Sequence, residues 1–156
     1  MNMERREVLK AGSGLGLLGL LVAAGLITPG EARAEWAKAA FDAKSIEDTL
    51  KALGAGAPAE SKDVTITGPD IAENGAVVPV ACACALPGVK RLMIFVEKNP
   101  SALTALFDVT DAVEASFSTR VKMGQSSNVT AVAVMGDGKV LFAHKEIKVT
   151  LGGCGG

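Results

Sequence analysis

The stretch "NVTAVAVMGDGKVLFAHKEIKVTL", residues 128–151, contains two segments typical of strands, separated by the turn residues Gly-Asp-Gly at 136–138. Residues 128–135 are almost continuously apolar, a pattern typical of a strand buried on both faces. Residues 139–151 form the second segment. A short turn of this composition between two such segments predicts a β-hairpin whose first strand lies in the middle of its sheet.

Five further strands are predicted upstream of the hairpin, at residues 64–67, 76–86, 91–97, 102–109 and 112–123. The last has the clearest alternation, with Val113, Ala115, Phe117, Val121 and Met123 on one face and Glu114, Ser116, Ser118, Arg120 and Lys122 on the other. Pro79 favours an edge position or a bulge for 76–86. Seven short strands at regular spacing predict an all-β, immunoglobulin-like antiparallel sandwich, with a small barrel as the alternative.

Two short helices are predicted before the strands. Residues 35–43 have helical spacing, and residues 45–54, "SIEDTLKALG", combine an N-terminal capping pattern at Ser45 and Asp48 with Gly54 as the C-terminal stop. Residues 55–63 are predicted to form a loop. The fold is therefore expected to be a sandwich with a short N-terminal helical segment.

The first 34 residues have the three parts of a cleaved export signal. A basic region precedes an uncharged run at 11–27, and an Ala-x-Ala site follows at 32–34. The 17-residue run is short for a membrane-spanning helix, which needs about 20 apolar residues, so a retained anchor is the less favoured interpretation. Residues 4–10, "ERREVLK", resemble a twin-arginine signal and depart from it at Glu4 and Val8. We expect a periplasmic protein with no membrane segment in its mature form.

The charge of the mature chain excludes one class of partner. The 122 residues after residue 34 carry 12 basic and 14 acidic side chains, a net charge of −2, with the two signs interspersed. Nucleic acid as a partner is excluded, because binding to phosphates requires clustered basic charge. The three cysteines cannot all pair within one chain, so at least one thiol is free or joined to another molecule.

The sequence ends in "GGCGG", which places Cys154 between Gly152 and Gly153 on one side and Gly155 and Gly156 on the other. Glycine stabilises neither helix nor strand, and a terminus is mobile unless it is tied down. These residues therefore predict a flexible arm that carries a thiol. At about 3.5 Å per residue at most, the four residues after Thr150 place the thiol roughly 14 Å from the last strand, enough to enter another protein's active-site channel.

No activating group accompanies Cys154. A catalytic thiol needs a base or a positive charge to lower its pKa from about 8.5. The single histidine, His144, lies ten residues earlier and is expected to be a half-exposed strand residue. We therefore interpret Cys154 as a site of covalent attachment that other enzymes load and unload. A disordered trailing end, an intermolecular disulfide and an independent thiol enzyme are the alternatives.

Cys82 and Cys84 lie two residues apart on a predicted strand and so point to the same face. Their β-carbons would be roughly 6–7 Å apart, too far for a direct disulfide. Two buried thiols acting as small apolar residues are the favoured interpretation. Accessory thiols or an interchain link on an exposed face, and a metal pair without further ligands, are the alternatives.

Several segments resemble the SoxY family, the sulfur carriers of the bacterial thiosulfate-oxidising (Sox) multienzyme system. They are the terminal "GGCGG", the final strand "KEIKVTL", "PDIAENGAVVPV" (69–80), "IFVEKNP" (94–100) and "STRVKMGQSSNVTAVAVMGDG" (118–138). The resemblance covers essentially the whole chain. It implies an immunoglobulin-like domain at 35–151 between the export signal at 1–34 and a swinging arm at 152–156.

The resemblance also implies partners. Members of the family pair with SoxZ, a second β-sandwich protein that lacks a signal of its own. A haem c enzyme, SoxAX, joins thiosulfate oxidatively to the motif cysteine, which corresponds to Cys154. A di-manganese hydrolase, SoxB, releases sulfate, and a sulfane dehydrogenase, SoxCD, can oxidise the remaining sulfur. The chain itself is expected to bind no metal and no cofactor. The alternative function is an exported interaction module whose terminal cysteine crosslinks subunits.

Overall fold

The computed structural model describes residues 34–150, and it confirms the hairpin. Strand β8 (Ser127–Met135) pairs antiparallel with β9 (Val140–Val149), from Ser127 opposite Ile147 to Val134 opposite Val140. In the turn, the Asp137 carboxylate accepts a hydrogen bond from the backbone of Lys139 at 3.0 Å. Gly138 has a φ of +88°, in the region that favours glycine. The turn composition therefore fixes the register of the last two strands.

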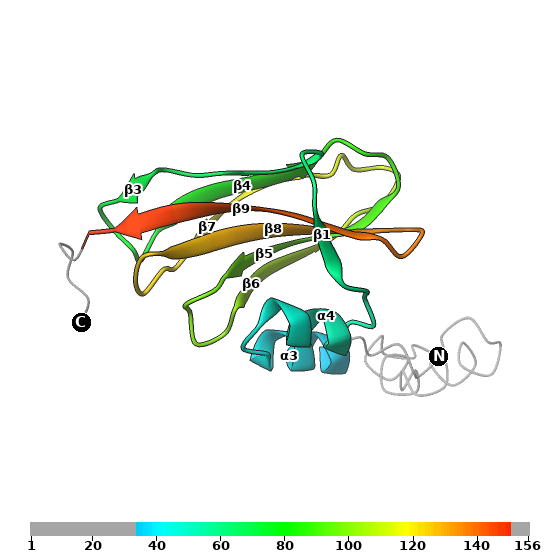
Figure 1. Ribbon diagram of the computed structural model, residues 1–156, viewed down its shortest axis with the longest axis horizontal. Helices are drawn as coiled ribbons and strands as arrows, with labels where there is room; N and C mark the ends of the chain where they lie inside the picture. Colours follow the sequence, from blue (N-terminus) through cyan, green and yellow to red (C-terminus); the bar gives the residue numbers. More distant parts are fainter. Residues whose placement is uncertain (1–33, 151–156) are drawn as a thin grey trace, which may run out of the picture. The chain divides into compact units, whose positions relative to one another are not determined.

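The hairpin belongs to the larger of two sheets (Figure 1). Its strand order is β1-β9-β8-β5-β6, with β5 at Val89–Val96 and β6 at Leu103–Asp108. As predicted, β8 lies in the middle of the sheet. Leu92 and Ile94 of β5 face the space between the sheets, whereas Met93 and Phe95 face the opposite side. Both faces of β5 and β8 are therefore buried, which explains their nearly continuous apolar sequences.

Two strands of the larger sheet lie where no strand was expected. β1 (Pro58–Glu60) and β3 (Ile71–Ala72) each pair in parallel with β9, along its first and its last residues respectively. The prediction of a loop over the whole of residues 55–63 is wrong in this respect. Segments of three and two residues are too short to show a period of two, and they are strands only because they pair with the free edge of β9.

The smaller sheet has the order β2-β4-β7, with β2 at Val64–Thr67, β4 at Val78–Cys84 and β7 at Ser116–Val121. Neither the edge position nor the bulge expected for the strand with Pro79 is found, because β4 lies between the other two and pairs with both without a register shift. Proline is tolerated there because β2 is short. Its last residue, Thr67, pairs with Ala81, so β2 ends before it reaches Pro79.

The predicted strand 112–123 is shorter in the structure, because residues 112–115 form a turn and Val113 is exposed. Within β7 the predicted alternation is confirmed: Phe117 and Val121 pack against the core between the sheets, and Arg120 is exposed. The rings of Phe107 and Phe117 stack with centroids 4.4 Å apart. This contact joins β6 to β7, one strand from each sheet.

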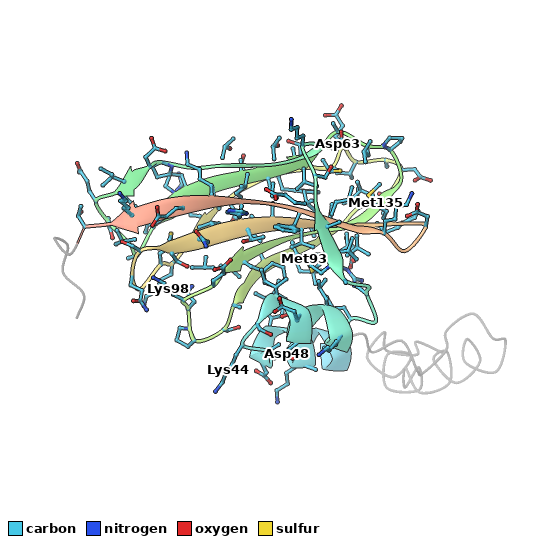
Figure 2. The ribbon with its side chains drawn as sticks, viewed as in Figure 1. Lys44, Asp48, Asp63, Met93, Lys98 and Met135 are labelled. Carbon is cyan, nitrogen blue, oxygen red and sulfur yellow. The ribbon has the colours of Figure 1, made fainter. Side chains whose placement is uncertain are left out.

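The helices cover the outer face of the larger sheet. Helix α3 (Ala34–Asp42) precedes α4 (Ile46–Ala52), whose N-cap Ser45 accepts a hydrogen bond from the backbone of Asp48 at 3.1 Å. Figure 2 shows Met93 between the sheet and the helices, where it is fully buried with Leu50 and Phe95. The helices thus form a third layer over β5 and β8. In the described part of the chain, no helix has the length and apolar character needed to span a membrane.

Candidate functional site

The predicted attachment site and the predicted export signal lie outside the residues that the structure describes. The residues outside the described part include Cys154, its neighbours Gly152, Gly153, Gly155 and Gly156, and residues 1–33 of the predicted signal. The structure does describe Thr150, four residues before Cys154. The end of β9 and its surroundings are therefore the root from which the predicted arm extends.

Hydrogen bonds hold the root on both sides. β3 pairs Ile71 with Lys148 and Ala72 with Val149, and the Thr150 backbone N–H donates to the Ala72 carbonyl at 3.1 Å. On the other side, the Val149 N–H donates to the Ser126 hydroxyl at 2.9 Å. The backbone is thus hydrogen-bonded up to Thr150, the last residue that the structure describes.

Gly75 makes the closest approach at the root. A β-carbon added to this residue would lie 2.4 Å from the Met123 carbonyl oxygen and 2.9 Å from Cγ1 of Val149. The Met123 N–H also donates to the Gly75 carbonyl at 2.7 Å. The sequence analysis did not identify Gly75, although the Asn-Gly pair at 74–75 is a turn signal. We refer to residues 71–77 and 123–126 together as the collar.

An ion pair fixes the chain just before the collar. The Lys145 ammonium lies 2.8 Å from a carboxylate oxygen of Asp70 and donates to the Gly68 carbonyl at 2.8 Å. The hydrogen bond from Lys145, together with its positive charge, lowers the pKa of the Asp70 carboxyl below its ordinary value. Asp70 therefore stays ionised over the neutral range and retains its hold on β9.

Cys82 and Cys84 lie in the core on the inner face of β4, as the favoured interpretation predicts. Cys82 is 1% exposed and Cys84 9%. Burial raises the pKa of the Cys82 thiol to about 11, which keeps it protonated and poorly nucleophilic at neutral pH. The structure therefore gives these two thiols the environment of small apolar side chains.

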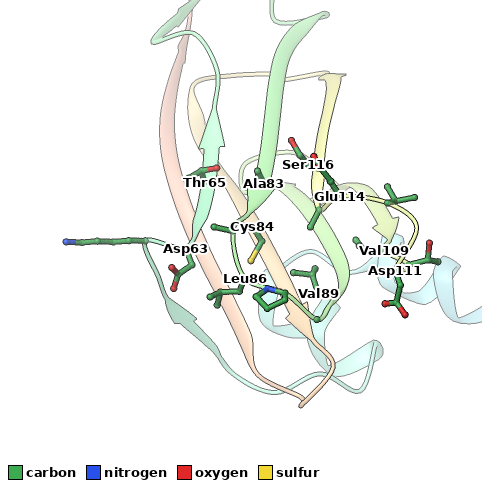
Figure 3. Close-up of a pocket in the computed structure, with 17 residues that line it drawn as sticks. Asp63, Thr65, Ala83, Cys84, Leu86, Val89, Val109, Asp111, Glu114 and Ser116 are labelled. Carbon is green, nitrogen blue, oxygen red and sulfur yellow. The ribbon is translucent and has the colours of Figure 1, made fainter.

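Cys84 lines a cavity of about 470 Å³ between the ends of the two sheets (Figure 3). Figure 3 shows its sulfur close to Leu86 and Val89. The cavity lies at the end of β4, whereas the collar lies at its beginning, because Val78 pairs with Val121 next to the collar and Ala83 with Ser116 next to the cavity. The structure therefore does not bring Cys84 together with the root of the arm.

His144 is exposed on the face of the larger sheet that the helices partly cover. It lines a cavity of about 230 Å³ together with Glu97 and Thr130, and the Thr130 hydroxyl donates to Glu97 at 3.3 Å. Cys82 and Cys84 belong to the core between the sheets, so neither thiol of residues 34–150 faces this imidazole. Within the same residues, no group of three or more potential metal ligands is found.

Comparison with known families and structures agrees with the motifs. Residues 50–154 match the family described as "Sulfur oxidation protein SoxY", and a search of curated proteins gives no match. The chain is similar to the solved sulfur carrier protein SoxY from Chlorobium limicola f thiosulfatophilum. The two are 36% identical with a TM-score of 0.62, over 69% of this chain and 97% of that chain.

Two structures of superoxide reductase (neelaredoxin) from Ignicoccus hospitalis are similar in fold alone. Each is 16% identical with a TM-score of 0.50. One match covers 56% of this chain and 79% of that chain, and the other 70% and 91%. The family match spans residues 50–154, Cys154 included, and the solved SoxY is 36% identical over 69% of this chain. The chain therefore belongs to the SoxY family of sulfur oxidation proteins.

Proposed function

We propose that this protein is a periplasmic sulfur carrier whose Cys154 holds thiosulfate-derived sulfur while partner enzymes act on it. The observation that carries the proposal is the contrast between its thiols. Cys82 and Cys84 are enclosed in the core, whereas Cys154 follows a hydrogen-bonded strand end by four residues. The match to the family also extends to residue 154.

The loading step is an oxidative coupling. The Cys154 thiolate and thiosulfate form a sulfur–sulfur bond and together lose two electrons, which pass to a haem c protein of the SoxAX type. The product is a cysteine S-thiosulfonate. A hydrolase of the SoxB type then adds water, releasing sulfate and two protons and leaving a persulfide on Cys154. This chain contributes the attachment atom and its delivery, and the enzymes contribute the catalytic groups.

Two further features belong to the proposal. The signal at residues 1–34 directs export, and a SoxZ-like β-sandwich subunit without its own signal is carried as a partner. No cofactor is required on this chain, because the transferred group is covalently bound to the cysteine.

The proposal is tested by loading the full chain, with its partner subunit, using thiosulfate and the haem c enzyme. Mass spectrometry should find the added mass on the C-terminal peptide of the wild-type chain and of Cys82→Ala and Cys84→Ala. Cys154→Ser should remain unmodified. Added mass found only on Cys82 or Cys84 would show that the attachment site is wrong.

The alternative is that Cys154 crosslinks two chains by a disulfide. The burial of the other two thiols favours Cys154 as the residue for such a link. Gels run without reductant distinguish the two functions. A predominantly crosslinked dimer that persists in the Cys82→Ala/Cys84→Ala variant, and that thiosulfate loading does not displace, would support the crosslinking function.

A further inference from the structure

Exposed apolar side chains gather around the root of the arm. Four large hydrophobic side chains are exposed among the described residues, namely Phe41, Ile71, Val77 and Val113. Ile71 and Val77 both belong to the collar, where they are 57% and 50% exposed. Val113 lies beside the cavity at the other end of β4. Single exposed hydrophobic residues are ordinary, but two within seven residues at the exit of the arm call for an explanation.

The collar is rigid where it meets the arm. Ile71 lies in β3, paired with Lys148, and the Val77 N–H donates to the Asn74 carbonyl at 3.3 Å within the turn that contains Gly75. Gly75 in turn packs against Met123 and Val149. The backbone that carries the two apolar side chains is therefore tied to the end of β9.

The length of the arm determines what must contact the collar. Cys154 follows Thr150 by four residues, so the thiol reaches at most about 14 Å beyond the last fixed residue. An enzyme that encloses the thiol in an active-site channel must therefore bring the mouth of that channel up to Thr150. Two residues of the collar lie at this strand end: Ala72 accepts the backbone hydrogen bond of Thr150, and Gly75 approaches Val149.

We propose that Ile71 and Val77 form the docking surface for the haem c enzyme that loads Cys154, through an apolar rim at the mouth of that enzyme's channel. This inference rests on the proposed carrier function. Charged side chains of both signs border the two residues, among them Glu73 and Lys148. Glu73 is the one charged residue of the collar, and Lys148 of β9, opposite Ile71, carries the opposite charge beside it. The two charges offset each other, so the apolar contacts supply the affinity. A small apolar contact of this kind suits a transient complex that separates after each loading step.

The test compares Ile71→Ser/Val77→Ser with Val113→Ser. Val113 is a matched control because it is 49% exposed, against 50% for Val77, and lies away from the collar. The full chain with its partner subunit serves as the substrate of the haem c enzyme in the presence of thiosulfate. The double variant should raise KM about tenfold, the equivalent of about 1.4 kcal/mol, with kcat within about twofold of the wild type. Val113→Ser should leave both constants unchanged.

Two further measurements keep the result interpretable. Iodoacetamide should alkylate Cys154 at the same rate in all variants, because that reaction needs no docking. Ile71→Val/Val77→Ile, which keeps the surface apolar, should retain the wild-type KM. An unchanged KM in the double serine variant, or an equal rise with Val113→Ser, overturns the docking surface and leaves the carrier function intact. If the wild-type chain is not loaded at Cys154 at all, both proposals are overturned.

Discussion

Strand β4 runs through the middle of the smaller sheet, whereas the last residues of β9 lie at the end of the part of the chain that the structure describes. β4 contains two cysteines, and a third cysteine follows β9 in the sequence. Cys82 and Cys84 on β4 are enclosed by apolar side chains, and Cys154 follows a strand end that is clamped by β3 and Ser126. The burial of Cys82 and Cys84 removes them as attachment sites and leaves Cys154 as the thiol that we propose for this role.

The largest expected difference between the two regions is in thiol reactivity. A maleimide or iodoacetamide should modify Cys154 at the rate of an exposed thiol and the β4 thiols about a thousandfold more slowly, because reaching them requires the sandwich to open. Peptide mapping after timed quenching measures the three rates. In denaturant all three should become similar. Fast modification of Cys84 in the folded protein, through the cavity beside it, would remove the contrast.

A substitution in the collar tests how firmly the root of the arm is held. Gly75→Ala should lower the free energy of unfolding by about 3 kcal/mol, because its β-carbon would overlap the Met123 carbonyl and Val149. Chemical denaturation measures the loss. Gly124→Ala is the control in the same collar, since a β-carbon there meets nothing within 4 Å. Equal stability of the two variants would contradict the close packing at the root.

The smallest expected effect is the change in protein stability with pH that the burial of Cys82 causes. Because the folded pKa is raised to about 11 from 9.0, the unfolded chain releases this proton at lower pH than the folded chain does. Stability should therefore fall as pH rises from about 9 to about 11, by up to about 2 kcal/mol, and the contribution should level off above that range. Denaturation curves of the wild type and Cys82→Ala measure it, with Cys84→Ala as the control. The same slope in Cys82→Ala would assign the loss to other groups.

The sequence was sufficient to predict the elements whose residues carry their own signal. The Gly-Asp-Gly turn, the alternation within β7 and the cap at Ser45 are local features, and the structure confirms each of them. β1 and β3 could not be predicted in this way, because β9 defines them. The central position of β4 was missed because Pro79 indicated an edge strand, and this proline is tolerated only because β2 ends before reaching it.

In the candidate site, too, features with a local sequence signal were predictable and features that depend on distant residues were not. Cys154 and its glycines are evident from the sequence, and their position lies outside the described residues. The burial of Cys82 and Cys84 followed from their shared face with apolar neighbours. The collar was not predictable, since Gly75 meets Val149 only through the folding of residues that are distant in the chain.

The parallel pairing of β9 with both β1 and β3 has a consequence for biogenesis. Pro58 pairs with Val140 and Ala72 with Val149, so two segments made early in synthesis have no partner until the last described strand is available. Long separations of this kind slow folding, because a large loop must close before the contact is gained. Completion of the sheet and delivery of the segment that leads to Cys154 thus depend on one strand. A nascent chain interrupted before β9 would lack both the completed sheet and the segment that leads to Cys154.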